Sequence, residues 1–201
     1  MPRTDVIIVG GGPGGMSCAI TLASACRKSW FNDRRIMVVD DDRSDLGKAL
    51  LNNAPGVPVG TTGSELLKQL REQLAQYPAA VRHEARVLRV RRHPDRGFEV
   101  AMDDGTTPRC DILVLATGYK RWELEGLKRE PVKHPRGGKS NRLMLEHDGC
   151  YLVEPELHVA GLLAGGSSQF AIAAGIGAQV AVDILSEWAG KRTHVHEVTE
   201  T

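Results

Sequence analysis

The residues with the clearest chemical meaning are three glycines that follow a short apolar run. The run Asp5–Val9 is almost wholly apolar, as expected of a parallel strand buried on both faces. It is followed by a G-x-G-x-x-G pattern and then by a predicted helix over 16–23. This spacing allows a tight turn, close approach of a pyrophosphate to the backbone, and close packing of helix on strand. The N–H groups at the helix N-terminus favour phosphate. The predicted dinucleotide-binding residues are Gly10, Gly12, Pro13, Gly14 and Gly15.

An acidic residue stands where the ribose of such a dinucleotide would lie. A second apolar run, 35–39, ends at Asp40, with Asp41 next to it. A carboxylate at this point of a βαβ unit accepts hydrogen bonds from ribose hydroxyls and disfavours a 2′-phosphate. Strand, glycines, helix, strand and acid together predict a nucleotide site. The alternative is a turn of the same shape that binds no phosphate.

The cysteines predict neither a zinc site nor a vicinal redox pair. The four cysteines stand at 18, 26, 110 and 150, and no two are spaced as Cys-x-x-Cys. Cys18 is expected to pack in the first helix as a small core residue. Cys150 lies in a polar turn and is the better candidate for a reactive thiol. No metal site is predicted.

Further elements must position these residues. Residues 46–58 are rich in Gly, Pro and Asn and predict a loop. An amphipathic helix is predicted from Gly63, with Ser64 as its N-cap. Three β-type runs follow at 85–92, 97–102 and 110–116, with an Asp-Asp-Gly turn between the second and the third. The third run is apolar enough to re-enter the buried sheet.

These pieces resemble the FAD-binding domain of the thioredoxin-reductase-like pyridine nucleotide–disulfide oxidoreductases. The resemblance covers about residues 4–120 and 150–190. It implies FAD rather than NAD as the ligand. The matching motifs are the GGGPGG turn with Asp40, the Asn53–Pro58 loop, the Gly63–Leu70 helix start, Ala116-Thr117-Gly118 and the Gln169–Gly175 helix start.

The resemblance implies a glutathione-reductase-like fold and a set of cofactor contacts. The expected α/β domain, 1–190, has a parallel central sheet with a helix on each side and a three-stranded β-crossover, followed by a polar tail, 191–201. FAD would place its pyrophosphate over Gly12–Gly15, its ribose on Asp40 and its adenine beside the Val87 backbone. The flavin ring would lie near Gly47, Asn53 and the helix that starts at Gln169. The other implied cofactor-binding residues are Ala116, Thr117, Gly118, Gly161, Leu162, Phe170 and Ala171.

Two departures from the family pattern bear on function. Family members insert an NADPH-binding domain after the Ala-Thr-Gly strand, whereas here a connector, 119–149, is too short for a second βαβ domain. Leu162 stands where the family has an Asp that binds the ribityl chain of FAD. The connector holds an excess of Lys and Arg, so it is either a solvated spacer or a docking surface for an acidic partner.

The favoured function is a minimal FAD-dependent oxidoreductase that passes electrons from an external donor, either NAD(P)H or a protein. The alternatives are a catalytically incomplete flavin-binding subunit and a structural or regulatory domain that no longer binds FAD. The 201 residues carry a net charge of +1, which gives no reason to expect nucleic acid as a partner. No apolar run is expected to span a membrane, so a cytoplasmic protein is predicted, with a homodimer as an option.

Overall fold

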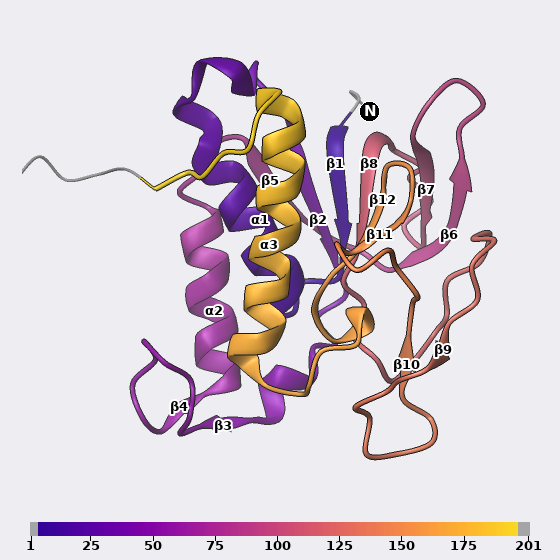
Figure 1. The fold of residues 1–201 in the computed structure, drawn as a ribbon. Coiled ribbons are helices and arrows are strands. Elements are labelled where there is room, and N and C mark those ends of the chain that lie inside the picture. Colours follow the sequence, from indigo (N-terminus) through magenta and orange to yellow (C-terminus); the bar gives the residue numbers. More distant parts are fainter. Residues whose placement is uncertain (1–3, 197–201) are drawn as a thin grey trace, which may run out of the picture.

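The computed structural model describes residues 4–196 and places them in two layers around a central sheet (Figure 1). Five parallel strands run in the order β12-β8-β1-β2-β5, and β11 is added antiparallel at the β12 edge. These strands are β1 (Thr4–Val9), β2 (Ile36–Asp40), β5 (Ala80–Glu84), β8 (Arg109–Leu115), β11 (Leu152–Glu154) and β12 (Leu157–Val159).

The helices α1 (Pro13–Ser24), α2 (Gly63–Leu74) and α3 (Phe170–Ala189) cover one face of this sheet. Strand residues such as Val6, Ile8 and Val114 pack there against the helices in one buried cluster. The sequence prediction of a helix on each side of the sheet is therefore wrong. The reason is that the three long helices of residues 4–196 all have buried side chains in the cluster on this face, such as Leu22 of α1, Leu74 of α2 and Ile184 of α3.

The opposite face is covered by the predicted three-stranded crossover. Strands β6 (Val87–Arg92) and β7 (Phe98–Met102) pair antiparallel, and β7 pairs with the start of β8. Their buried side chains, including Val90, Phe98 and Val100, form a second apolar cluster with the alternate residues of β1 and β8. Because successive side chains of a strand point to opposite faces, the fully apolar β1 and β8 supply both clusters. The predicted fold class is confirmed.

The remaining elements are short. They are the 3-10 turns η1 (Ala25–Arg27), η2 (Ser29–Phe31), η3 (Asp45–Lys48) and η4 (Gly161–Ala164), and the two-residue strands β3 (Leu50–Leu51), β4 (Thr61–Thr62), β9 (Val132–Lys133) and β10 (Leu143–Met144).

The N-cap of α2 differs from the prediction. Thr62 caps the helix by accepting a hydrogen bond from Glu65 N, whereas Ser64 lies inside the first turn. The Ser64 hydroxyl instead donates to the Gly47 carbonyl at 2.9 Å. Thr62 fits the cap better because its extended backbone aims the hydroxyl at the free N–H groups of the helix.

Helix α3 has a length and mean hydropathy that would allow it to cross a membrane, and 33% of that apolar window is buried. This differs from the sequence prediction that no segment is long and apolar enough. The inner side of α3 packs closely on α1, because a Cβ on Gly177 would lie 2.0 Å from the Gly14 carbonyl oxygen. The side chains of Val180, Ile184 and Leu185 are buried in the core.

The C-terminal tail begins after α3, and residues 197–201 of the predicted tail lie outside the described residues. Its first residues are attached to the end of α3, since Thr193 N donates to the Ser186 hydroxyl at 3.1 Å. Val195 packs against the helical core.

Candidate functional site

The carboxyl ends of β1, β2 and β8 meet at one edge of the sheet, and a cavity of about 730 Å³ opens there. Ligands of open parallel sheets bind at this edge. The volume lies within the range of small-molecule and cofactor sites. All of the predicted cofactor-binding residues line the cavity except Gly15, Gly47 and Ala171. The fold thus brings together residues that are up to 160 positions apart in the sequence, from Gly10 to Phe170.

The three motif glycines have separate steric roles. Gly10 has φ +108°, and a Cβ there would lie 2.5 Å from the Ala116 carbonyl oxygen. A Cβ on Gly15 would lie 1.9 Å from the Gly10 carbonyl oxygen, so this glycine lets α1 pack on the strand without lining the cavity. A Cβ on Gly12 would meet only the Ser44 side chain, at 3.1 Å. Gly12 therefore leaves space for a ligand, whereas Gly10 and Gly15 are required by the fold.

Helix α1 begins at this point without a side-chain cap. Gly12 is its N-cap and makes no side-chain hydrogen bond, and Pro13 follows as the first helical residue. A glycine cap leaves the first N–H groups of the helix available to an anion at the cavity wall. The start of α3 is similar, because Gln169 is its N-cap and also makes no side-chain cap bond. Both helix N-termini therefore give the cavity a partial positive charge.

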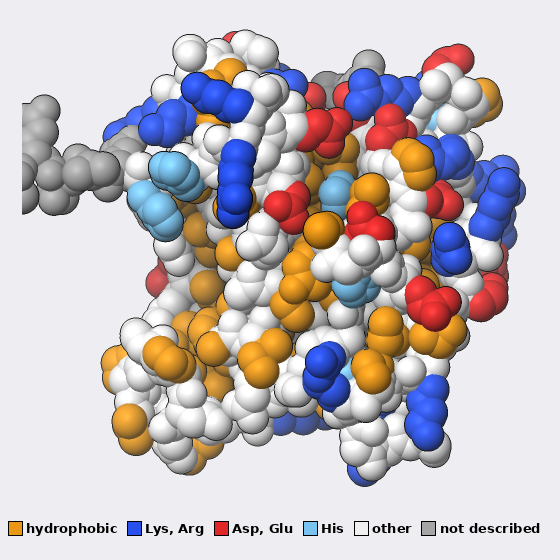
Figure 2. Space-filling model, viewed as in Figure 1, with side chains coloured by type: hydrophobic (Ala, Val, Ile, Leu, Met, Phe, Trp, Pro, Cys, Tyr) orange, Lys and Arg blue, Asp and Glu red, His pale blue; other side chains and the backbone are white. Residues whose placement is uncertain are grey.

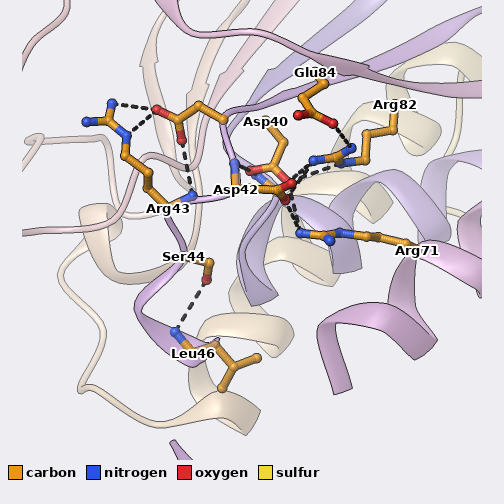
Figure 3. Close-up of polar contacts among 10 residues, drawn as sticks. Asp40, Asp42, Arg43, Ser44, Leu46, Arg71, Arg82 and Glu84 are labelled. Carbon is orange, nitrogen blue, oxygen red and sulfur yellow. Dashed lines mark hydrogen bonds and ion pairs between the residues drawn. The ribbon is translucent and has the colours of Figure 1, made fainter. Parts of the chain in front are cut away.

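Asp40 is buried at the end of β2, and Figure 3 shows it within a cluster of ion pairs. One of its carboxylate oxygens accepts hydrogen bonds from Gly11 N and Asp42 N, each at 3.2 Å. The other pairs with Arg82 at 3.1 Å and with Arg71 at 3.5 Å. A ribose hydroxyl must therefore share this carboxylate with donors of the protein itself.

The two arginines hold further acidic groups at the same place. Arg82 and Arg71 both pair with Asp42, and Arg82 also pairs with Glu84 at 3.3 Å. Burial acts to lower the pKa of Arg82, but the charge of Asp40 and its hydrogen bond outweigh burial and raise this pKa. The Arg82 guanidinium thus stays charged, and the ion pairs of both arginines fix the β2 end.

The other end of the cavity is built from the 46–58 loop and the start of α3. Asn53 Nδ2 donates to Gln169 Oε1 at 3.0 Å, which ties these two segments together. Gly47 lies behind this wall, where its carbonyl is held by Ser64. Leu162 and Ser168 also line the cavity, so an apolar side chain stands where the family Asp is expected.

Sequence reasoning missed a part of the wall that the start of the connector supplies. Residues 119–124 line the cavity next to residues 43–46 and 48. Lys120 Nζ pairs with Asp45 at 2.6 Å, and Arg43 pairs with Glu123 at 3.3 Å. These pairs join the connector to the loop after β2. The sequence signal was the position of the segment directly after Ala116-Thr117-Gly118, because this is where β8 ends at the cavity.

Cys18 packs in the core as the sequence predicted, whereas the reactivity of Cys150 stays a prediction. Cys18 is fully buried in the core, and burial raises the pKa of its thiol far above the ordinary value. Burial likewise raises the pKa of Cys110 to about 12. Cys150 is exposed, in a turn where its N–H donates to Asp148 Oδ1 at 2.7 Å. None of the cysteines lines the cavity. Within residues 4–196, no group of three or more His, Cys, Asp or Glu side chains is arranged to hold a metal ion.

Comparisons with known proteins bear on the fold that holds this cavity. No family model matches the chain. It is 30% identical over 130 residues to a ferredoxin–NADP reductase of Bradyrhizobium sp. strain BTAi1, which is 65% of this chain and 37% of that protein. It is 27% identical over 124 residues to ferredoxin–NADP reductase 1 of Listeria welshimeri, covering 62% of this chain and 37% of that protein. The chain thus spans little more than a third of the curated relatives that it matches.

Solved structures match nearly the whole chain. An oxidoreductase from Agrobacterium tumefaciens has a TM-score of 0.75 at 15% identity, covering 94% of this chain and 100% of that one. A thioredoxin reductase from Gloeobacter violaceus has a TM-score of 0.73 at 14% identity, covering 98% of both chains. The resemblance expected from the sequence is confirmed: the chain has the mostly parallel α/β fold of thioredoxin-reductase-like oxidoreductases.

Proposed function

We propose that this chain is an FAD-binding flavoprotein and acts as an oxidoreductase that takes electrons from an external donor. The observation that carries the proposal is the single cavity that joins both predicted ends of the cofactor site, from Gly10–Gly14 to Asn53 and Gln169. The fold and the named activities of the relatives support the same reading.

The residues present fit a dinucleotide of this kind. A Cβ on Gly12 would point into space that only the Ser44 side chain approaches, which leaves room for a phosphate. The uncapped start of α1 would hold the pyrophosphate, and Asp40 would orient the ribose. The 46–58 loop and the start of α3 would enclose the flavin ring. Bound FAD would supply hydride and electron transfer, which no protein side chain supplies by itself.

The chain's own residues would then orient the cofactor and set its charge environment. The N–H groups at the start of α3 would stabilise negative charge at the adjoining end of the cavity. The Asn53–Gln169 hydrogen bond would hold the two walls at a fixed distance. No acid, base or nucleophile of the protein is needed for such a role.

We also propose that electrons arrive from a separate donor at the open side of the cavity. Leu50, which lines the cavity, is exposed, and so are the apolar side chains of Val59 and Ile172. Figure 2 shows hydrophobic side chains gathered over β3, β4 and the start of α3, at the lower left. The relatives are named for ferredoxin and NADP, so either kind of donor is a candidate. The connector would replace an NADPH domain within this chain.

A second candidate function is a domain that no longer binds FAD. Two observations favour it: Leu162 lines the cavity in place of an acid, and Asp40 already has four protein donors.

Titration of the purified chain with FAD separates the two candidates. We expect FAD fluorescence to be quenched on binding to the wild-type chain, and Gly12→Ala to weaken binding by at least about tenfold because its Cβ takes phosphate space. The melting temperature of Gly12→Ala should stay close to that of the wild type, because φ at this position is −76° and no backbone atom blocks a Cβ. Equal FAD affinity of the two proteins would remove the phosphate assignment.

A further inference from the structure

The connector does more than span the distance between β8 and β11. Four consecutive backbone carbonyls at the end of η4 each accept a hydrogen bond from a connector residue. The Leu162 carbonyl also accepts from Gly165 N within the turn, at 3.1 Å. The last carbonyls of a 3-10 turn have no partner inside it, so those that follow need donors from elsewhere. The bonds, from donor to carbonyl oxygen, are His134 Nε2 to Leu162 (3.0 Å), Leu145 N to Leu163 (2.9 Å), His147 Nε2 to Ala164 (3.2 Å) and Arg136 Nη1 to Gly165 (2.8 Å).

Both histidines are fixed in the tautomer that these bonds require. Nδ1 of His134 accepts a hydrogen bond from Arg136 N at 3.0 Å, so its Nε2 carries the proton that is donated to Leu162. Nδ1 of His147 accepts from the backbone N–H groups of Gly149 and Tyr151. Each ring therefore accepts from its own segment and donates to η4.

The part of the connector that carries His134 is itself attached to the end of β8. Strands β9 and β10 form a small hairpin, and Leu143 N donates to the Tyr119 carbonyl at 2.8 Å. The His134 ring packs edge-on against the Tyr119 ring, with 5.3 Å between ring centroids. The Arg142 guanidinium lies 5.0 Å from the centroid of the Tyr119 ring. The His134 side chain is buried, and Tyr119 lines the cavity.

The turn that the connector holds is a wall of the cavity. Gly161 and Leu162 line the cavity. A Cβ on Gly14 would lie 2.7 Å from Gly161 Cα, so η4 packs directly against the first turn of α1. A small movement of η4 would therefore alter the space for the cofactor. Because the Leu162 side chain offers no hydrogen-bond acceptor to a cofactor, the fit of the cofactor depends more on the position of the backbone at this turn.

We propose that the connector is a clamp that sets the position of η4 against FAD, with His134 and Arg136 as positioning residues. This rests on the FAD site proposed above. In this proposal the connector supports one wall of the cofactor site and is not merely a solvated spacer. Its effect is on cofactor affinity, because an η4 that is not held in place must be ordered when FAD binds.

The test compares FAD dissociation constants with the thermal stability of the FAD-free proteins. We expect His134→Leu and Arg136→Ala each to raise the dissociation constant by about threefold to tenfold, in line with the loss of one hydrogen bond. His134→Gln, whose amide can donate to the Leu162 carbonyl, should recover most of the affinity. Lys139→Ala, an exposed position in the same connector, is the matched control and should bind as the wild type does.

Amide hydrogen exchange over residues 160–168 of the FAD-free proteins gives a second measurement. Faster exchange in His134→Leu together with weaker FAD binding supports the clamp. Unchanged FAD affinity in both variants, with only a lower melting temperature, would overturn the positioning role and leave a packing role. Failure of the wild-type chain to bind FAD would be a different result, because it would remove the proposed function and this role with it.

Discussion

At the scale of single residues, Leu162 is the clearest departure from the family that the sequence resembles, because that family has an Asp at this position. Leu162 is half-buried at the cavity wall, and its carbonyl is held by His134. A substitution at this position therefore changes the side chain at the cavity wall and leaves the carbonyl oxygen bound to His134. If FAD binds as proposed, we expect an acid introduced here to face the cofactor from the cavity wall.

We predict that Leu162→Asp tightens FAD binding by about tenfold, since a hydrogen bond to a charged acceptor contributes about 1.5–3 kcal/mol. Fluorescence titration of both proteins with FAD checks this, with Leu162→Ala as the control for loss of the leucine side chain alone. Unchanged or weaker binding would mean that the ribityl chain does not pass this residue.

A buried histidine gives a prediction about pH. His158 lies on β12, is 7% exposed, and its Nδ1 has no partner among the described residues. Burial lowers its pKa to about 4, against an opposing effect of Asp148. The unfolded chain binds a proton near pH 6.5 but the folded chain does not, so stability is full above pH 6.5 and falls as the pH drops toward 4.

His158→Leu should remove this dependence. We expect the difference in unfolding free energy between wild type and variant to change by about 3 kcal/mol between pH 7 and pH 4. Urea unfolding at several pH values measures it, with His194→Gln, an exposed position, as the control. A difference that stays constant with pH would show that the pKa of His158 is the same in the folded and the unfolded chain.

At the scale of elements, the crossing of α1 and α3 depends on glycines that the sequence motif explains only in part. Gly14 belongs to the dinucleotide pattern, but its close neighbour Gly177 lies in the middle of α3. Gly175, two residues earlier on the same helix, faces open space. The two glycines of α3 should therefore respond in opposite directions to the same substitution.

We predict that Gly177→Ala destabilises the protein by about 1–3 kcal/mol, because the added Cβ would overlap the Gly14 carbonyl oxygen. Gly175→Ala should instead stabilise it by up to about 1 kcal/mol, as expected for alanine in place of glycine within a helix. Thermal unfolding of both variants measures these two changes in stability. Equal effects would contradict the close helix crossing.

The elements also show what a sequence can and cannot predict. Local signals located β1, α1, β2 and the crossover strands, because each has its own apolar period and turn residues. The cap of α2 was misplaced by two residues, since Ser64 is by residue type a better cap than Thr62 and only the backbone conformation favours Thr62. The side on which each helix packs, and the bonds of His134 and His147 to η4, depend on contacts between distant segments that no local pattern encodes.

At the scale of the whole molecule, charge is distributed unevenly around the cavity. The basic residues at its mouth are mostly paired, as Lys120 is with Asp45 and Arg43 is with Glu123. Further along the connector, Lys128, Arg129 and Lys133 are exposed. The basic docking surface stays a prediction, and the exposed basic residues that could form it lie in the middle of the connector rather than at its start.

We predict that a protein donor reduces the flavin faster than NADPH does, and that added salt slows the protein reaction. Reversing the charges of Lys128, Arg129 and Lys133 to Glu should slow reduction by ferredoxin about tenfold in stopped-flow experiments, without altering the flavin spectrum. Lys191→Glu, at the far end of α3, serves as the control. Saturable reduction by micromolar NADPH alone would instead mean that the chain holds its own nicotinamide site.

The central proposal is that one cavity, running from residues Gly10–Gly14 to the start of α3, holds FAD. Its most direct test is the visible absorbance spectrum of the purified chain, with the bound cofactor quantified after denaturation. We predict a flavin spectrum and about one FAD for each chain, either as purified or after the FAD-free protein is incubated with FAD and dialysed. A colourless protein that retains no FAD after this incubation would contradict the account.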